Sequence, residues 1–156
     1  MSDSTSGEDR DEKLNRELIE FLNELRVVLP GVQVLFAFLL TVPFTNQFQK
    51  VTNEQRQVYF WTFICTTLAT ALLIAPSVHH RLQWRQHDKE RLLRVANRLS
   101  IGGMVFLTLA LVGAVYLVTD LLFHPAAAAV VTAAVGAFFA WFWWALPLWR
   151  VANRHR

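Results

Sequence analysis

The chain has 156 residues and a formal net charge of +3, and 54% of its residues are hydrophobic whereas only 17% are charged. The apolar residues gather in four blocks of roughly 20 residues that hold almost no charge, which excludes an ordinary soluble globule and a disordered chain. A single cysteine excludes a disulfide scaffold and any site built from several cysteines. These features indicate a small polytopic membrane protein.

The N-terminal region divides into a polar tail and an amphipathic helix. Residues 1–10 offer nothing to bury, and we expect them to form a disordered tail. Over residues 11–26, leucine and phenylalanine recur at spacings of three and four with glutamates between them, which predicts a cytoplasmic amphipathic helix. Its acidic polar face is unlike that of a helix on an anionic lipid surface. We therefore expect it to pack against basic segments of the same protein.

Four apolar stretches are each long enough to cross about 30 Å of hydrocarbon at about 1.5 Å per residue. The stretches lie at about residues 27–45, 57–78, 99–123 and 126–148, so residues 27–148 form a four-span membrane domain. The second and third spans are expected to project beyond the lipid as helices that turn near residues 86–88, and residues 149–156 form a basic tail. The predicted fold is all-α, a four-helix transmembrane bundle preceded by the amphipathic helix.

Basic residues fall almost entirely at one end of the spans. Lys50 and Arg56 lie in the loop between the first two spans, whereas the other Lys and Arg residues lie in the N-terminal segment, the middle connection or the C-terminal tail. Because cytoplasmic loops carry the excess of Lys and Arg, both termini are predicted to lie in the cytoplasm, in a multi-pass protein of the cell membrane. Bases that flank apolar spans indicate membrane lipid rather than nucleic acid as the partner.

Polar side chains inside the first two spans form one candidate site. They are Arg26, Gln33 and Thr41 on one face of the first span and Thr62, Thr66 and Thr70 in a row on the second. An amide in hydrocarbon needs hydrogen-bond partners, and the threonine row would supply them to Gln33. These groups either hold the helices together, with threonine also able to bond its own helix, or line a narrow polar path. A bound lipid or small ligand is a third alternative.

Ionisable residues near the ends of the spans are candidates for a channel mouth or for pH sensing. They are Glu24, His79, His80, Asp120 and His124. Asp120 and His124 are four residues apart, so they can pair at the outer mouth, or they simply mark a solvated hairpin end. The adjacent histidines are expected to contact lipid headgroups, with pH sensing as the alternative. No ionisable residue is expected at mid-bilayer, where an ion or proton carrier would need one.

Small residues line faces of the third and fourth spans. Gly103, Ala110 and Ala114 share one face, and a second seam consists of Ala129, Ala133, Ala137 and Ala140. Small residues let helices approach closely in lipid, which predicts either a tight hairpin of the third and fourth spans or a contact with a second subunit. We expect a homo-oligomer, with a further protein partner at the cytoplasmic face as an additional possibility.

Known catalytic motifs are missing from the sequence. It contains no phosphate-binding loop, no dinucleotide-binding glycine pattern, no zinc-spaced cysteine and histidine set and no nucleophile elbow. Cys65 sits among apolar residues, where a reactive thiolate is disfavoured, and is read as a packing residue. We therefore expect no enzymatic activity, no cofactor and no metal.

Residues 23–40, NELRVVLPGVQVLFAFLL, together with His79-His80-Arg81 at the end of the second span, carry a resemblance to a known family. The chain resembles an uncharacterised family of small four-span membrane proteins from actinobacteria, some of whose members carry automatic names as sodium/proton antiporters. The resemblance covers about residues 14–124 and implies a four-span fold. Two functions stay open: an oligomeric transport or channel-like protein for ions or protons, and a non-transporting scaffold or accessory subunit.

Overall fold

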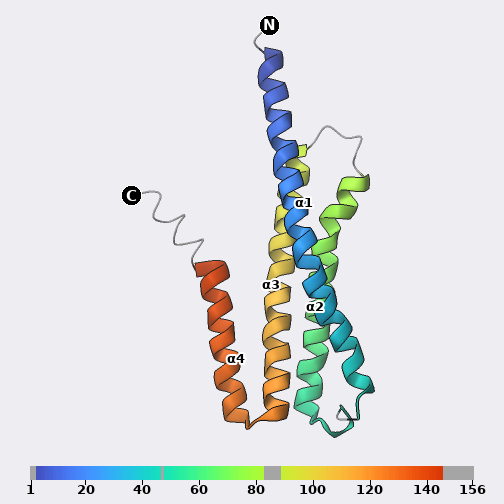
Figure 1. Ribbon diagram of the computed structural model, residues 1–156, viewed down its shortest axis with the longest axis vertical. Helices are drawn as coiled ribbons and strands as arrows, with labels where there is room; N and C mark the ends of the chain where they lie inside the picture. Colours follow the sequence, from blue (N-terminus) through green and yellow to red (C-terminus); the bar gives the residue numbers. More distant parts are fainter. Residues whose placement is uncertain (1–2, 47, 83–88, 146–156) are drawn as a thin grey trace.

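The computed structural model describes residues 3–46, 48–82 and 89–145, which form helices and connections with no strand among them. Four helices run in alternating directions (Figure 1): α1 is Asp3–Thr41, α2 is Asn53–Leu82, α3 is Lys89–Leu122 and α4 is Pro125–Ala140. Two short 3₁₀ helices, η1 (Val42–Phe44) and η2 (Phe48–Lys50), join α1 to α2. A π-helical turn, η3 (Trp141–Ala145), follows α4.

Each helix contains a stretch long and apolar enough to cross a membrane. These stretches are Ile19–Phe44, Asn53–Val78, Arg94–Leu122 and Pro125–Trp143, the last of which includes part of η3. Few of their residues are buried, between 6% and 22% of the apolar window in each, so most of their apolar side chains are free to face lipid. The chain is a multi-pass membrane protein with four spanning helices.

α1 is one continuous helix that includes the predicted amphipathic helix and first span, and it also includes most of the residues for which the sequence predicted a tail. It begins at Asp3 and passes through Pro30 without ending. Pro30 removes one backbone hydrogen bond, but Leu25 and Val32 on either side of it are buried against the bundle and hold the helix in place.

The other helices agree broadly with the predicted spans and differ at their ends. α2 and α3, with 30 and 34 residues, are longer than the roughly 20 residues that cross hydrocarbon. α4 ends at Ala140, where contacts between aromatic side chains coincide with the π-helical turn: the ring centroids of Phe138 and Phe142 are 5.2 Å apart. The predicted turn at residues 86–88 and the tail at 149–156 lie outside the described residues.

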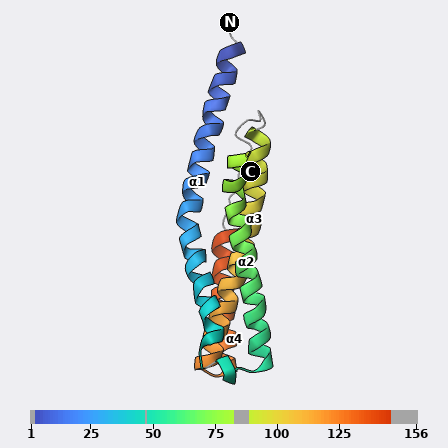
Figure 2. The ribbon, with the colours of Figure 1, turned by 90° about the vertical axis from the view of Figure 1, so that its right-hand side faces the viewer.

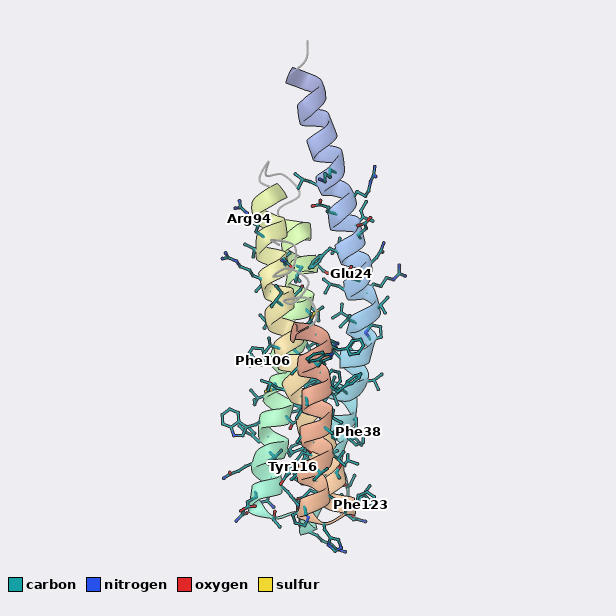
Figure 3. The ribbon with its side chains drawn as sticks, turned by 90° about the vertical axis from the view of Figure 1, so that its left-hand side faces the viewer. Glu24, Phe38, Arg94, Phe106, Tyr116 and Phe123 are labelled. Atoms are coloured by element: carbon teal, nitrogen blue, oxygen red, sulfur yellow. The ribbon has the colours of Figure 1, made fainter. Side chains whose placement is uncertain are left out.

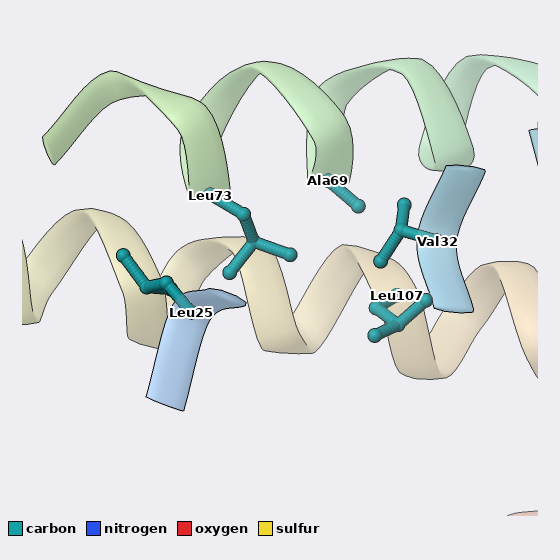
Figure 4. Close-up of a cluster of buried hydrophobic side chains, with 5 residues drawn as sticks. All are labelled: Leu25, Val32, Ala69, Leu73 and Leu107. Atoms are coloured by element: carbon teal, nitrogen blue, oxygen red, sulfur yellow. The ribbon is translucent and has the colours of Figure 1, made fainter. Parts of the chain in front are cut away.

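The core lies where α1 crosses the α2–α3 pair (Figure 4). Its buried side chains are Leu25 and Val32 from α1, Ala69 and Leu73 from α2, and Leu107 from α3. On α1, Leu25 and Val32 are followed by buried Leu39 at the same seven-residue spacing, so a single line of side chains faces the bundle. This line fixes which face of α1 points away from the other helices.

α2 and α3 are the most extensively packed pair of helices. A Cβ atom added to Gly103 would lie 2.8 Å from Cγ of Leu73, and one added to Gly113 would collide with the hydroxyl oxygen of Thr62. Gly103, predicted to serve either a hairpin with the fourth span or a contact with a second subunit, therefore serves the contact with α2 instead, as does Gly113. They allow α3 to approach α2, because α2 presents branched side chains at both contact points.

α4 is peripheral and packs beside α3, away from α1 and α2 (Figure 1). Ala128 is its buried residue, and the nearest atom to a Cβ added at Gly136 is a methyl of Val112, 3.9 Å away. The predicted alanine seam, Ala129, Ala133, Ala137 and Ala140, is exposed along its whole length. The seam therefore does not form the contact between α3 and α4.

The glycine contacts predict a position-dependent effect of adding one methyl group. We expect Gly113→Ala to destabilise the protein by about 1–3 kcal/mol, because the methyl overpacks the contact with Thr62. Gly31→Ala is the matched control, since nothing lies within 4 Å of its added Cβ, and it should leave stability unchanged or higher. Denaturant titration in detergent micelles measures both, and equal stability of the two variants would contradict the α2–α3 contact.

Candidate functional site

The threonine row of α2 lies at the contact with α3. Thr62 and Thr66 are buried and Thr70 is half-buried. Their hydroxyls donate to backbone carbonyls one turn earlier: Thr62 to Val58 at 2.7 Å, Thr66 to Thr62 at 2.8 Å and Thr70 to Thr66 at 2.8 Å. Each hydroxyl thus uses its only proton within its own helix. The hydroxyl donors of the threonine row are therefore satisfied within α2, and the row presents mainly methyl groups and acceptor lone pairs to the neighbouring helices.

The structure does not bring Gln33 to the threonine row, which corrects the predicted hydrogen bond between them. Gln33, Arg26 and Thr41 are all exposed, and the Thr41 hydroxyl donates to the carbonyl of Ala37 at 2.9 Å. Val32 takes the buried position on α1, and Gln33 follows it by one residue, which is about 100° around the helix. The six candidates therefore line no common path within the described part of a single chain.

Among the ionisable candidates, Asp120 forms a hydrogen bond with Gln55 rather than a pair with His124. Gln55 Nε2 donates to Asp120 Oδ2 at 2.8 Å and links the start of α2 to the end of α3. His124 is exposed, and its carbonyl accepts the first N–H groups of α4. Gln55 is not among the residues predicted from the sequence, although the Thr52–Gln55 spacing is that of a capping box, and both capping bonds are present at 3.0 and 3.2 Å.

A second polar contact ties α1 to α2 at the same end of the bundle, which we call the hairpin end because it carries the α1–α2 and α3–α4 connections. The Tyr59 hydroxyl donates to the carbonyl oxygen of Leu39 at 2.8 Å. In a helix that carbonyl would accept the N–H of residue 43, but residue 43 is proline and has none. Tyr59 supplies the missing donor, a role that the position of Pro43 four residues after Leu39 signals in the sequence.

A cavity of about 110 Å³ opens beside these two contacts, between α1, η2, α2 and α3. Its lining is apolar apart from Gln55 and Tyr59, whose polar groups already take part in hydrogen bonds. A buried water needs two to four polar partners, so this lining suits an apolar guest. Phe38 and Val118 on its rim are exposed on the surface that faces hydrocarbon (Figure 3 labels Phe38).

The ionisable candidates at the opposite end of the bundle do not form a cluster that the structure describes. Glu24 is exposed on α1 and lies at that end together with Arg94 (Figure 3). The backbone of His79 and His80 belongs to the end of α2, and their side chains lie outside the described residues. Among the residues whose positions are described, no three His, Cys, Asp or Glu side chains come together as metal ligands.

The Tyr59 contact predicts a measurable coupling with Pro43. We expect Tyr59→Phe to destabilise the protein by about 1–3 kcal/mol, because the Leu39 carbonyl then has no donor. Tyr116→Phe is the matched control and should cost little. In a Pro43→Ala background the backbone N–H returns, so Tyr59→Phe should cost less there. A double-mutant cycle by denaturant titration measures this, and equal costs in both backgrounds would refute the compensation.

No curated protein and no solved structure matches the chain. Residues 7–147 match the model of a family of unknown function, DUF6328, a range that includes α2, α3, α4 and nearly all of α1. The match is consistent with the uncharacterised family expected from the sequence. The chain belongs to this family of unknown function, DUF6328.

Proposed function

We propose that the chain is a non-enzymatic membrane scaffold or accessory subunit that engages a protein partner through the part of α1 outside the membrane. The observation that carries this proposal is the length of α1. Its 39 residues extend for about 58 Å, roughly twice the hydrocarbon thickness. The spanning stretch begins at Ile19, so the section before it projects beyond the bundle, as Figures 1 and 2 show.

The end of α1 that leaves the membrane offers both charge and apolar surface to a partner. It comprises the projecting section and the first turns of the spanning stretch, whose 26 residues exceed the roughly 20 that cross hydrocarbon. Glu17 in the projecting section and Glu20 and Glu24 in those first turns are exposed, and Ile19 is 60% exposed. Phe21 and later apolar residues of α1 pack against the core, which leaves Ile19 and the glutamates uncovered. A basic amphipathic helix would complement this surface, with Lys or Arg opposite the glutamates and apolar side chains against Ile19.

The proposal places both termini in the cytoplasm and the protein in the cell membrane. Lys13, Arg16 and Arg98 are exposed at the end of the bundle where α1 begins, whereas Lys50 and Arg56 lie at the hairpin end. The whole sequence has the same bias, which is the distribution that the positive-inside rule associates with the cytoplasm. The projecting section of α1 is then accessible to cytoplasmic proteins.

The interior of the single chain supports a non-transporting role. Its centre consists of Leu25, Val32, Ala69, Leu73 and Leu107, and the hydroxyls of the threonine row donate within α2. An ion leaving water needs replacement oxygen ligands or charges along its route. The described residues of one chain provide no continuous set of such groups.

The scaffold function predicts binding without flux. Purified protein in liposomes should pass no ions under Na⁺, K⁺ or proton gradients, whereas affinity purification from native membranes should recover one dominant partner. The variant Glu17→Gln/Glu20→Gln/Glu24→Gln should lower recovery of that partner several-fold, because it removes the complementary charge. Glu54→Gln at the hairpin end is the matched control and should retain the partner. Ion flux by the purified chain, or unchanged recovery with the triple variant, would contradict this function.

Transport or channel-like activity for ions or protons, by an oligomer, is the second candidate, and the exposed Gln33 favours it. This amide lies near the middle of the α1 span and faces away from the bundle, where copies of the chain could meet around a shared polar route. The automatic antiporter names in the actinobacterial family that the sequence resembles agree with this candidate. Four helices rarely enclose a path alone, so it requires several copies.

One flux experiment distinguishes the two functions. If the second candidate holds, liposomes with wild-type protein dissipate an imposed gradient, and Gln33→Leu lowers the rate at least about tenfold, because the polar group on the route is lost. Thr67→Val is the matched control, since Thr67 is also exposed but its hydroxyl donates to the carbonyl of Phe63 at 2.9 Å. Flux that survives Gln33→Leu excludes a route past Gln33.

A further inference from the structure

Gln33 is an unpaired amide at the centre of a membrane span. The spanning stretch of α1 is Ile19–Phe44, so Gln33 lies about 21 Å from one end and about 16 Å from the other along the helix axis. Its side chain is exposed, and it forms no hydrogen bond within the part of the chain that the structure describes. An amide at this depth faces hydrocarbon, which offers neither donors nor acceptors.

Threonines of α2 and α3 differ from Gln33 in this respect. Thr66, Thr67 and Thr108 donate to the carbonyl four residues earlier in their own helices, at 2.8–2.9 Å. A glutamine amide has two N–H donors and an acceptor oxygen, and on α1 none of them has a partner in the described chain. The described residues of the chain therefore leave the amide to be satisfied by a partner beyond them.

The face around Gln33 permits the approach of another helix. Pro30 and Ala37, at −3 and +4 from Gln33, are exposed and lie on the same side of α1. Neither has a long side chain that would keep a second helix at a distance. Pro30 also lacks an N–H, so the carbonyl of Arg26 on this side has lost its helical donor. This face of α1 therefore lets a second helix come close, and it carries the Gln33 amide and a carbonyl that lacks its helical donor.

We propose that a second copy of this chain binds here, in a symmetric dimer in which the two α1 helices cross at Gln33. Copies with the same orientation in a membrane are related by a two-fold axis along the membrane normal, and a residue near that axis meets its own counterpart. The two Gln33 amides then lie at the same depth, and each donates an N–H to the carbonyl oxygen of the other.

The charged residues near this face are compatible with the crossing. Arg26 lies about 10 Å along the helix from Gln33, towards the end of the bundle where α1 begins. Helices that cross near mid-membrane diverge towards both ends, so the two Arg26 side chains can extend into water. Glu24 is exposed beside Arg26 and offsets part of the repulsion between the two copies. The dimer is independent of the proposed scaffold function and of any flux.

Energy transfer between donor- and acceptor-labelled full-length chains in vesicles measures the association as the protein-to-lipid ratio varies. We expect wild-type chains to dimerise and Gln33→Leu to weaken the association constant at least about tenfold. Gln33→Asn should retain most of it, because the amide remains, and Thr67→Val should behave as wild type. Dimerisation of Gln33→Leu at wild-type strength, or monomers at every ratio, would overturn the proposal.

Cysteine crosslinking identifies the face and does not depend on the stability of one variant. In a Cys65→Ser background, oxidation should join chains that carry Ala37→Cys, on the Gln33 face. It should not join chains that carry Gly31→Cys, which lies two residues from Gln33 but about 160° from it around the helix. Adding Gln33→Leu should reduce the Ala37→Cys product several-fold. Efficient crosslinking through Ala133→Cys on α4 instead would place the interface on the alanine seam and refute the contact at Gln33.

Discussion

Hydrocarbon contains no hydrogen-bond partners, so polar groups inside the four spans depend on the protein to satisfy them. The threonines of α2 and α3 do this locally, by donating to their own helix. The Leu39 carbonyl, deprived of its donor by Pro43, is satisfied by Tyr59 of the neighbouring helix. Gln33 has neither solution within the described chain, so its amide is the group in the spans that needs a partner molecule most.

The same constraint explains how the helices are arranged. Apolar burial gives little net drive between helices in lipid, so close approach and dispersion contacts decide which pairs associate. Gly103 and Gly113 let α3 approach α2, and the line of Leu25, Val32 and Leu39 places α1 against that pair. α4 contributes little to the core and presents most of its surface outward. At the hairpin end, Tyr59 joins α1 to α2 and the Gln55–Asp120 bond joins α2 to α3.

Periodicity and hydropathy predicted four helices and their approximate spans, because both signals are local. The predicted contacts were less accurate. A hydrogen bond was predicted between Gln33 and the threonine row. A step of one residue turns a side chain by about 100°, however, and Val32 occupies the inward position on α1. The spacing of Asp120 and His124 predicted that these two would pair, whereas Gln55, 65 positions away along the chain, donates the hydrogen bond to Asp120. Such pairings depend on which helices become neighbours, and spacing within one helix does not report that.

The sequence by itself determined that this protein spans a membrane four times, because the length of an uncharged apolar stretch is a direct measure of what it can cross. It also determined which polar groups require a partner, since that follows from residue type and depth alone. Only the tertiary structure decided where those partners are: inside the same helix for the threonines of α2 and α3, on a neighbouring helix for Leu39 and Asp120, and nowhere among the described residues for Gln33. The physical reason is that partner choice depends on the rotation and proximity of packed helices, which glycines such as Gly113 permit and branched side chains restrict.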